Sequence, residues 1–126
     1  MKDKLIEYST AKLAKEKGFN EECYFSFAKI SKEYCIFKSE YSETNSEINK
    51  YEYSAPTQNL LRKWLREIYN IHIVVYVMEN SDGSIYYDFG LKQVINWLTD
   101  KSSKPREFLT YEEALEIALQ EALKLI

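Results

Sequence analysis

The fold is decided by residues 54–79, which read SAPTQNLLRKWLREIYNIHIVVYVME and change from a helical pattern to a strand pattern without a break. In the first half, apolar residues recur every three or four positions, which is the spacing of a helix that buries one face. In the second half, β-branched residues dominate, which is typical of a strand. The helical stripe consists of Leu60, Leu61, Trp64, Leu65 and Ile68.

Both ends of this helix, about residues 56–69, carry recognisable signals. Pro56 suits a first helical turn because its fixed φ fits the helix and its missing N–H would have no partner there. Ser54 is the expected cap, and Asn70 is a residue type that ends helices in left-handed backbone. The strand that follows has two apolar faces, so we expect it to be central or covered on both sides. One face carries Ile71, Ile73, Val75 and Val77, and the other carries His72, Val74, Tyr76 and Met78.

A turn and a second strand complete a predicted β-hairpin over about residues 71–89. The turn is expected at residues 80–83, NSDG, because Asp82 and Gly83 tolerate positive φ at little cost. The sequence SIYYDF at residues 84–89 then returns to residue types that favour strands. We therefore expect an antiparallel pair of strands that starts directly after the central helix.

The C-terminal stretch predicts a second long helix, about residues 111–126. Thr110 and Glu113 form a capping box, in which the Thr110 hydroxyl accepts from the Glu113 N–H and the Glu113 side chain reaches back to the cap. The early glutamates also suit the positive end of the helix dipole. The expected buried stripe is Ala114, Leu115, Ala118, Leu119, Ala122, Leu123 and Ile126, and the expected solvent face is Glu112, Glu116, Gln120, Glu121 and Lys124.

The N-terminal region predicts a short helix over about residues 10–17. Ser9 or Thr10 is the expected cap, because a side-chain oxygen there satisfies a free backbone N–H of the first turn. Gly18 is the expected left-handed residue after the last turn. The helix is short, so we expect it to depend on tertiary contacts.

The remaining segments are assigned from residue types. Residues 23–27 and 34–37 are rich in aromatic and β-compatible side chains, which predicts two paired strands. Residues 38–53 are polar and lack any period, which predicts a loop. Residues 107–109 are expected to add a brief strand. Helical spacing predicts a short helix at Leu91, Val94, Ile95 and Leu98, although the same residue types allow an extended path.

Together these elements predict an α+β fold in a single domain, residues 1–126. We expect a small antiparallel sheet packed with two long amphipathic helices, about 56–69 and 111–126, and a short N-terminal helix at about 10–17. A chain of this length can bury one core without metal or disulfide support. Periodicity leaves two arrangements open, with both long helices on one face of the sheet or one helix on each face.

Composition argues against several classes of function. The net charge is −3, from 17 Lys and Arg against 20 Asp and Glu, so nucleic-acid binding through a general basic field is disfavoured. No run of the chain reaches the roughly 18 apolar residues that span a bilayer, and the start MKDKLIEY lacks the apolar core of a secretory signal. We therefore expect a cytoplasmic protein that does not bind membranes.

No pattern indicates a cofactor, a metal or a catalytic residue. Cys23 and Cys35 lack CxxC spacing, and the only histidine is His72, so neither a redox motif nor a zinc site is supported. The three glycines form no phosphate-binding loop. A nucleophile pair would have to use His72, which lies within the predicted strand. We therefore expect a protein that is not an enzyme.

Two groups of residues are candidates for binding a partner or ligand. A basic cluster on the central helix suits phosphates or acidic side chains. The 11 tyrosines suit sheets and binding surfaces, because a tyrosine offers an apolar body with one polar tip. The candidate site residues are Arg62, Lys63 and Arg66 on the helix, and His72, Tyr76 and Tyr86 on the hairpin.

Three blocks of the chain are similar to a known family. They are AKLAKEKGF at residues 11–19, SAPTQNLLRKWLREIYNIHI at 54–73 and TYEEALEIALQEALKLI at 110–126. These blocks resemble a family of small uncharacterised proteins encoded by gut-type bacteria and by their phages and mobile elements. The resemblance implies a genetic setting and favours an accessory or host-interaction role. It implies no activity, cofactor or catalytic residue.

Three functions follow from these observations, and the first is preferred. It is a non-enzymatic accessory protein of a phage or mobile element that binds a protein partner, with homo-oligomerisation through an apolar sheet face as an option. The second is a small-ligand or nucleotide binder, such as an anti-defence sponge, that uses the basic cluster and tyrosines. The third is an enzyme centred on His72. A pocket at the arginines would favour the second function, and an exposed apolar patch would favour the first.

Overall fold

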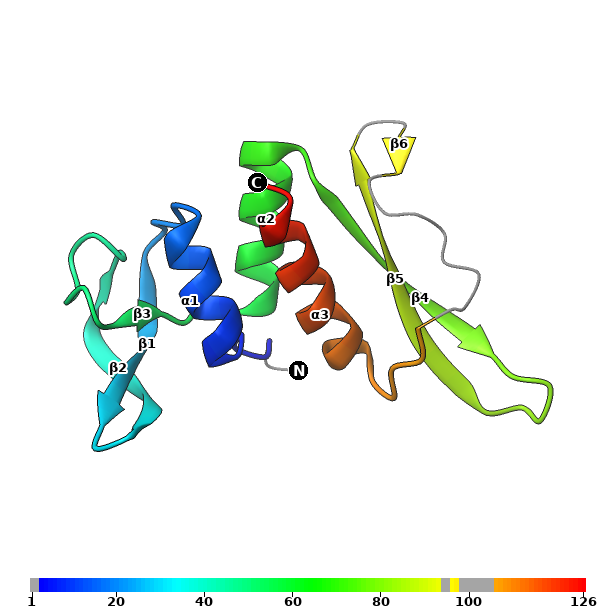
Figure 1. The fold of residues 1–126 in the computed structure, drawn as a ribbon, viewed down its shortest axis with the longest axis horizontal. Coiled ribbons are helices and arrows are strands. Elements are labelled where there is room, and N and C mark those ends of the chain that lie inside the picture. The colour runs from blue at the N-terminus through cyan, green and yellow to red at the C-terminus, as the bar shows by residue number, and fades with distance from the viewer. Residues whose placement is uncertain (1–2, 94–95, 98–105) are drawn as a thin grey trace. The chain divides into compact units, whose positions relative to one another are not determined.

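The protein has an α+β fold with three helices and small antiparallel sheets in the part that the structure describes (Figure 1). The structure is a computed structural model, and it describes residues 3–93, 96–97 and 106–126. These residues group into two compact units, one up to Leu61 and one from Arg62 onward. Each unit contains one three-stranded sheet, whereas the sequence predicts a single sheet. The assignment of one domain to the whole chain stays a prediction.

The first unit contains a helix and an antiparallel sheet with the strand order β2-β1-β3. The predicted pairing of residues 23–27 with 34–37 is confirmed, because Phe27 lies opposite Ile36 in the ladder. The expected loop at residues 38–53 is wrong in its first part, since β2 continues through it as a largely exposed strand. The elements are α1 (Tyr8–Glu16), β1 (Cys23–Ile30), β2 (Glu33–Glu43) and β3 (Tyr53–Ser54).

Helix α1 ends as expected but begins earlier. Gly18 has a φ of +92°, and the N–H of Phe19 donates to the carbonyl of Ala14 at 3.0 Å, which closes the last turn. Glu7 is the N-cap residue and makes no side-chain capping bond, so the expected caps Ser9 and Thr10 lie inside the helix. The extended chain before α1 sets this boundary, because the Ile6 N–H is bonded to the Pro56 carbonyl at 3.0 Å.

Helix α2 (Gln58–Tyr69) is capped by Thr57 instead of Ser54. The Leu60 N–H donates to the Thr57 hydroxyl oxygen at 3.1 Å, whereas Ser54 belongs to β3. Asn70 ends the helix in left-handed backbone with a φ of +56°, as its residue type predicts. The apolar stripe of α2 is buried at Leu61, Trp64 and Leu65, half-buried at Leu60 and 60% exposed at Ile68.

The second unit contains the predicted hairpin and a helix packed on it. Strand β4 pairs with β5 in one continuous antiparallel register, from His72 opposite Lys92 to Glu79 opposite Ile85. Gly83 has a φ of +89° in the turn between them. Helix α3 packs against both strands, and the hairpin tip extends beyond this helix (Figure 1). The elements are β4 (His72–Glu79), β5 (Ile85–Gln93), β6 (Asn96–Trp97) and α3 (Tyr111–Lys124).

The short helix expected around residues 91–98 is wrong where the structure describes the chain. Leu91 lies in β5, and Asn96–Trp97 form β6, which pairs with the end of β5. The buried Phe89 and Leu91 alternate along β5, so the β-compatible residue types follow the extended path that was the alternative. Val94, Ile95 and Leu98 lie outside the described residues.

Helix α3 begins at the predicted Thr110 cap. The Glu113 N–H donates to the Thr110 hydroxyl oxygen at 3.1 Å, while the Glu113 carboxylate accepts from the N–H of Leu109 at 3.2 Å, one residue before the expected one. The brief strand expected at 107–109 is present as a bridge between Phe108 and Tyr87. Glu116 is buried, although the helical pattern places it on the solvent face. The buried apolar residues of α3 are Ala114, Leu115, Ala118, Leu119, Ala122 and Leu123.

No helix among the described residues has both the length and the apolar character that crossing a bilayer requires. The predicted cytoplasmic location stays a prediction.

Candidate functional site

The basic residues of α2 line neither of two pockets found among the described residues. Arg62 connects α2 to β4 and α3, because its guanidinium donates to the carbonyl oxygen of Ile73 at 2.6 Å and to the hydroxyl of Tyr111 at 2.8 Å. Lys63 lies 4.0 Å from the Glu67 carboxylate in an exposed ion pair one helical turn along, and Arg66 is exposed. The three cations predicted as a cluster therefore have separate surroundings, and Arg62 already has two partners within the fold.

The three candidate residues of the hairpin lie on one face of its sheet. In the register of β4 and β5, His72 and Tyr76 alternate on the same face, and Tyr86 lies opposite Met78 on that face. His72 is half-buried, and its Nε2 atom lies 3.0 Å from the side-chain oxygen of Asn70. Burial, followed by the charge of Asp88, raises the pKa of Tyr76. These three residues share a face, but Tyr86 is buried within it.

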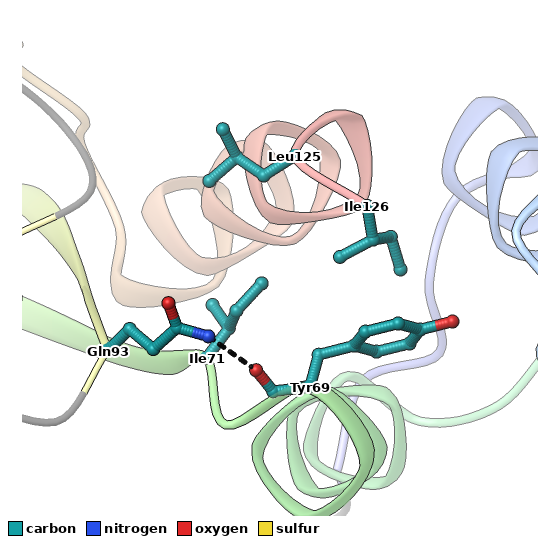
Figure 2. Close-up of a pocket in the computed structure, with 5 residues that line it drawn as sticks. All are labelled: Tyr69, Ile71, Gln93, Leu125 and Ile126. Carbon is teal, nitrogen blue, oxygen red and sulfur yellow. Dashed lines mark hydrogen bonds between the residues drawn. The ribbon is translucent and has the colours of Figure 1, made fainter.

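A pocket in the second unit has a different lining from the predicted site (Figure 2). Its volume is about 350 Å³, and the side-chain amide of Gln93 spans part of it to donate to the Tyr69 carbonyl at 2.9 Å. None of the six candidate residues lines it, and its walls carry no charged side chain. It therefore offers little to orient a phosphate or a nucleotide. The lining residues are Tyr69, Ile71, Gln93, Leu125 and Ile126.

The most extensive apolar exposure in the first unit lies on β1 and β2, which the sequence pattern did not single out. Strand β2 forms one edge of its sheet and has 11 residues, most of them exposed. Tyr41 is 76% exposed, and the residues around it are mixed in polarity. A period-2 pattern is absent because neither face of this strand is fully covered, and this explains why the segment resembles a loop. The exposed large apolar residues here are Tyr24, Ile30, Ile36, Phe37 and Tyr41.

The backbone of β2 also has unpaired groups on its outer side. Phe25 of β1 accepts a hydrogen bond from the Ala55 N–H at 2.8 Å, so its backbone polar groups point away from β2. Phe25 lies opposite Lys38, whose N–H and carbonyl must therefore point to the open edge. The backbone N–H and carbonyl groups of Ile36 and Tyr34, which lie two and four residues before Lys38, point to the open edge as well. These three residues are a template for an additional strand.

A tyrosine cluster stabilises the first unit. The ring of Tyr8 on α1 stacks on Tyr34 of β2 with centroids 4.1 Å apart and meets Tyr53 of β3 edge-on. Burial, followed by a hydrogen bond to Tyr34, raises the pKa of Tyr8 to about 12. The ammonium group of Lys15 lies over the Tyr53 ring at 5.3 Å and donates to the Glu52 carbonyl at 2.6 Å. These tyrosines therefore join the helix to the sheet instead of forming an open ligand platform.

The two cysteines differ in environment. Cys23 is buried, and desolvation, with a smaller effect of the Glu21 charge, raises the pKa of its thiol to about 11. Cys35 is an exposed free thiol on β2. Within the described ranges, no group of three or more His, Cys, Asp or Glu side chains is arranged to hold a metal ion.

We expect one thiol per chain to react with Ellman's reagent at pH 8 in the folded protein. Cys35 should react within minutes, and Cys23 should react only after denaturation, because burial keeps it protonated and inaccessible. Absorbance at the thiolate band gives the count, and Cys35→Ser is the control, which should show no reactive thiol until denaturant is added. Two thiols that react at equal rates in the folded protein would contradict this expectation.

Comparison with known proteins identifies no relative of this chain. No protein family model, no curated protein and no solved structure matches the chain. Function is therefore inferred from the surfaces of the chain itself.

Proposed function

We propose that this chain is a non-enzymatic accessory protein that acts by binding another protein at the edge of β2. The observation that supports this is the edge strand β2, which pairs with β1 in regular register over residues 33–38 and has exposed apolar side chains and outward backbone groups there. An extended segment of a partner would add to the sheet as a further strand and pair with the outward groups of Tyr34, Ile36 and Lys38.

The side chains of β2 would supply specificity. An added strand brings main-chain hydrogen bonds that are independent of sequence, while alternate side chains along the edge select the partner. The exposed rings of Phe37 and Tyr41 offer apolar contact area at a low cost in side-chain entropy. Glu33, Lys38 and Glu40 place both signs of charge along the same strand, which disfavours partners with the wrong charge pattern.

The proposal also includes a genetic setting, which is a phage or mobile element of gut-type bacteria. The blocks at residues 11–19, 54–73 and 110–126 resemble small proteins of phages and mobile elements in gut-type bacteria, so the partner is a protein of the host cell or of the phage. The nucleotide-binding alternative is not favoured, because Arg62 is bonded within the fold and the pocket beside Tyr69 and Gln93 has no basic lining.

The test removes one backbone donor from the edge. Ile36→Pro deletes an N–H that points to the open side, so the β1 ladder keeps its hydrogen bonds while an added strand loses one and meets the proline ring. Ile36→Thr is the matched control, because it removes a similar amount of apolar surface and keeps the N–H. A photo-reactive phenylalanine analogue at Phe37 then records contacts in phage-infected cells of a gut bacterium.

We expect discrete cross-linked proteins with the parent chain and with Ile36→Thr, and at least a tenfold loss of them with Ile36→Pro. Far-UV circular dichroism confirms that the proline variant is folded. Absence of specific cross-links in all three chains would overturn the proposal, and so would cross-links that Ile36→Pro leaves unchanged.

A further inference from the structure

We propose that the outer edge of β4 pairs with β4 of a second copy of this chain, so that the protein forms a two-fold symmetric dimer. This surface lies in the second unit and is separate from the β2 edge, so the inference goes beyond the proposed function. It follows from the direction of the backbone groups, the lack of protection at this edge, and the symmetry and charge of the strand.

Contacts on the far side of β5 fix the direction of the β4 backbone. Tyr87 exchanges both backbone hydrogen bonds with Phe108, at 2.8 and 2.9 Å, so its polar groups point away from β4. Tyr87 lies opposite Val77, and paired residues of an antiparallel ladder point either both inward or both outward. The N–H and carbonyl of Val77 therefore point to the open edge, and so do those of Val75, two residues earlier.

Two further contacts agree with this assignment. The guanidinium of Arg106 donates to the Phe89 carbonyl at 2.7 Å from the side of β5 away from β4, and Phe89 lies opposite Val75. On the open side, Arg62 donates to the Ile73 carbonyl at 2.6 Å, as expected for an outward group. The outward residues of β4 are therefore Ile73, Val75, Val77 and Glu79.

Beyond Ile73, whose carbonyl already accepts from Arg62 at 2.6 Å, the β4 edge lacks the features that usually prevent strand addition. Its sequence, HIVVYVME, contains no lysine and no proline, and its ladder with β5 has no bulge. No strand of the described part of the chain pairs with it, because β4 is the terminal strand in the order β4-β5-β6. Val77 is 62% exposed, and Met78 beside it is exposed as well. The exposed apolar part of this edge, at Val77 and Met78, is expected to be covered in solution.

Symmetry selects the register in which a second copy would pair with β4. In an antiparallel pair, the backbone groups of two opposite residues point either both toward the other strand or both away from it. In a symmetric pair of identical strands, opposite residues are therefore an even number of positions apart, so the residue at the centre lies opposite its own copy. The outward residues Ile73, Val75, Val77 and Glu79 are symmetric about Tyr76. The register centred on Tyr76 is therefore the one that places each of them opposite another outward residue, while a shift by one residue in either direction leaves some without a partner. At each end, the second lone pair of the Ile73 carbonyl would accept from Glu79 of the other copy beside the existing bond from Arg62.

The side chains brought together in this register are compatible. Tyr76 lies opposite Tyr76 of the second copy, Val75 opposite Val77 and Val74 opposite Met78, so apolar groups face apolar groups. Glu79 carries the one carboxylate of the strand and lies opposite Ile73 of the other copy. The carbonyl of that Ile73 accepts a hydrogen bond from Arg62 of its own chain. The dimer thus places a carboxylate near an arginine at both ends of the shared ladder.

Val77→Pro tests the dimer without breaking the hairpin. The N–H that it removes points outward, so the β5 ladder is preserved, and Val77→Thr is the control that keeps the donor. In sedimentation velocity at about 50 μM, we expect the parent chain and Val77→Thr at twice the monomer mass of 15.0 kDa, and folded Val77→Pro at 15.0 kDa. A parent chain that sediments as a monomer would overturn the inference, and so would a folded Val77→Pro that stays dimeric.

The register is tested by disulfide formation in a Cys35→Ser background. Residues opposite each other in a non-hydrogen-bonded pair have Cα atoms about 4.5 Å apart, which is within the range that a disulfide spans. Tyr76→Cys should therefore give a covalent dimer on mild oxidation, whereas Val74→Cys, which faces Met78, should not. A dimer in which only Val74→Cys cross-links would overturn the proposed register.

The charge contact and the independence of the two surfaces are tested together. Glu79→Lys places two cations together at each end of the ladder and is expected to raise the dimer dissociation constant about fivefold, and Glu79→Gln by less. Ile36→Pro should leave the dimer mass unchanged, so loss of the β2 partner and loss of the dimer are separate results. A Glu79→Lys dimer as tight as the parent would contradict the arrangement.

Discussion

Leu119→Ala is expected to lower the free energy of unfolding by about 2–5 kcal/mol, the range for a fully buried leucine whose removal leaves a cavity. Leu119 has no exposed surface and belongs to α3, the helix that packs against β4 and β5. The small residues Ala118 and Ala122 beside it have no side-chain length to fill the space, so relaxation is limited. Urea unfolding followed by far-UV circular dichroism measures the change.

Leu109→Ala is the matched control for this substitution. Leu109 precedes the same helix and is 81% exposed, so the identical change in side chain should alter stability by less than about 0.5 kcal/mol. Its backbone N–H remains available to Glu113. Equal losses for the two variants would mean that α3 is not buried against the hairpin.

Arg62→Ala is expected to lower the free energy of unfolding by about 1–3 kcal/mol, because it removes a charged donor from two acceptors within the fold. The Ile73 carbonyl would lose the 2.6 Å bond and the Tyr111 hydroxyl the 2.8 Å bond. Arg62→Lys should recover only part of the loss, since one ammonium group cannot reproduce the forked geometry of the guanidinium. The unfolding midpoint in urea gives the comparison.

Lys63→Ala is the neighbouring control on the same helix. Its ion pair with Glu67 is exposed and 4.0 Å long, so removal should cost less than about 0.5 kcal/mol. If Arg62→Ala were as mild as Lys63→Ala, the arginine would be free for another role. A nucleotide-dependent rise in the melting temperature of the parent chain, lost in Arg62→Ala, would then favour the ligand-binding alternative.

Local patterns predicted the elements that depend on residues close in the chain. The switch from α2 to β4 at Asn70 is encoded by a change of hydrophobic period and by a residue that accepts left-handed backbone. The turn at Gly83 and the cap at Thr110 likewise depend on a few adjacent residues. Each of these features depends on residues within a few positions of one another, so the local sequence is sufficient to predict it.

The candidate site was less predictable, because it depends on which strands lie at an edge. The basic pattern of α2 singled out Arg62, but only the fold shows that its guanidinium is bonded to Ile73 and Tyr111. The pattern in the second half of β2, from residue 38 onward, indicated a loop, because a strand exposed on both faces has no alternation of polarity. Glu116 followed the helical pattern of a solvent face and is nevertheless buried.

The sequence by itself determined helices α1, α2 and α3, the hairpin of β4 and β5 and the α+β class, because each arises from contacts between residues near in the chain. The same local patterns predicted a helix around residues 91–98, where the described residues are strand, and a loop in the second half of β2. The tertiary structure alone decided that the strands form two sheets, that β2 and β4 are edges, and that the backbone groups of Val75 and Val77 point outward. Those properties depend on hydrogen bonds between distant segments, such as the bridge of Tyr87 to Phe108, which no local period encodes.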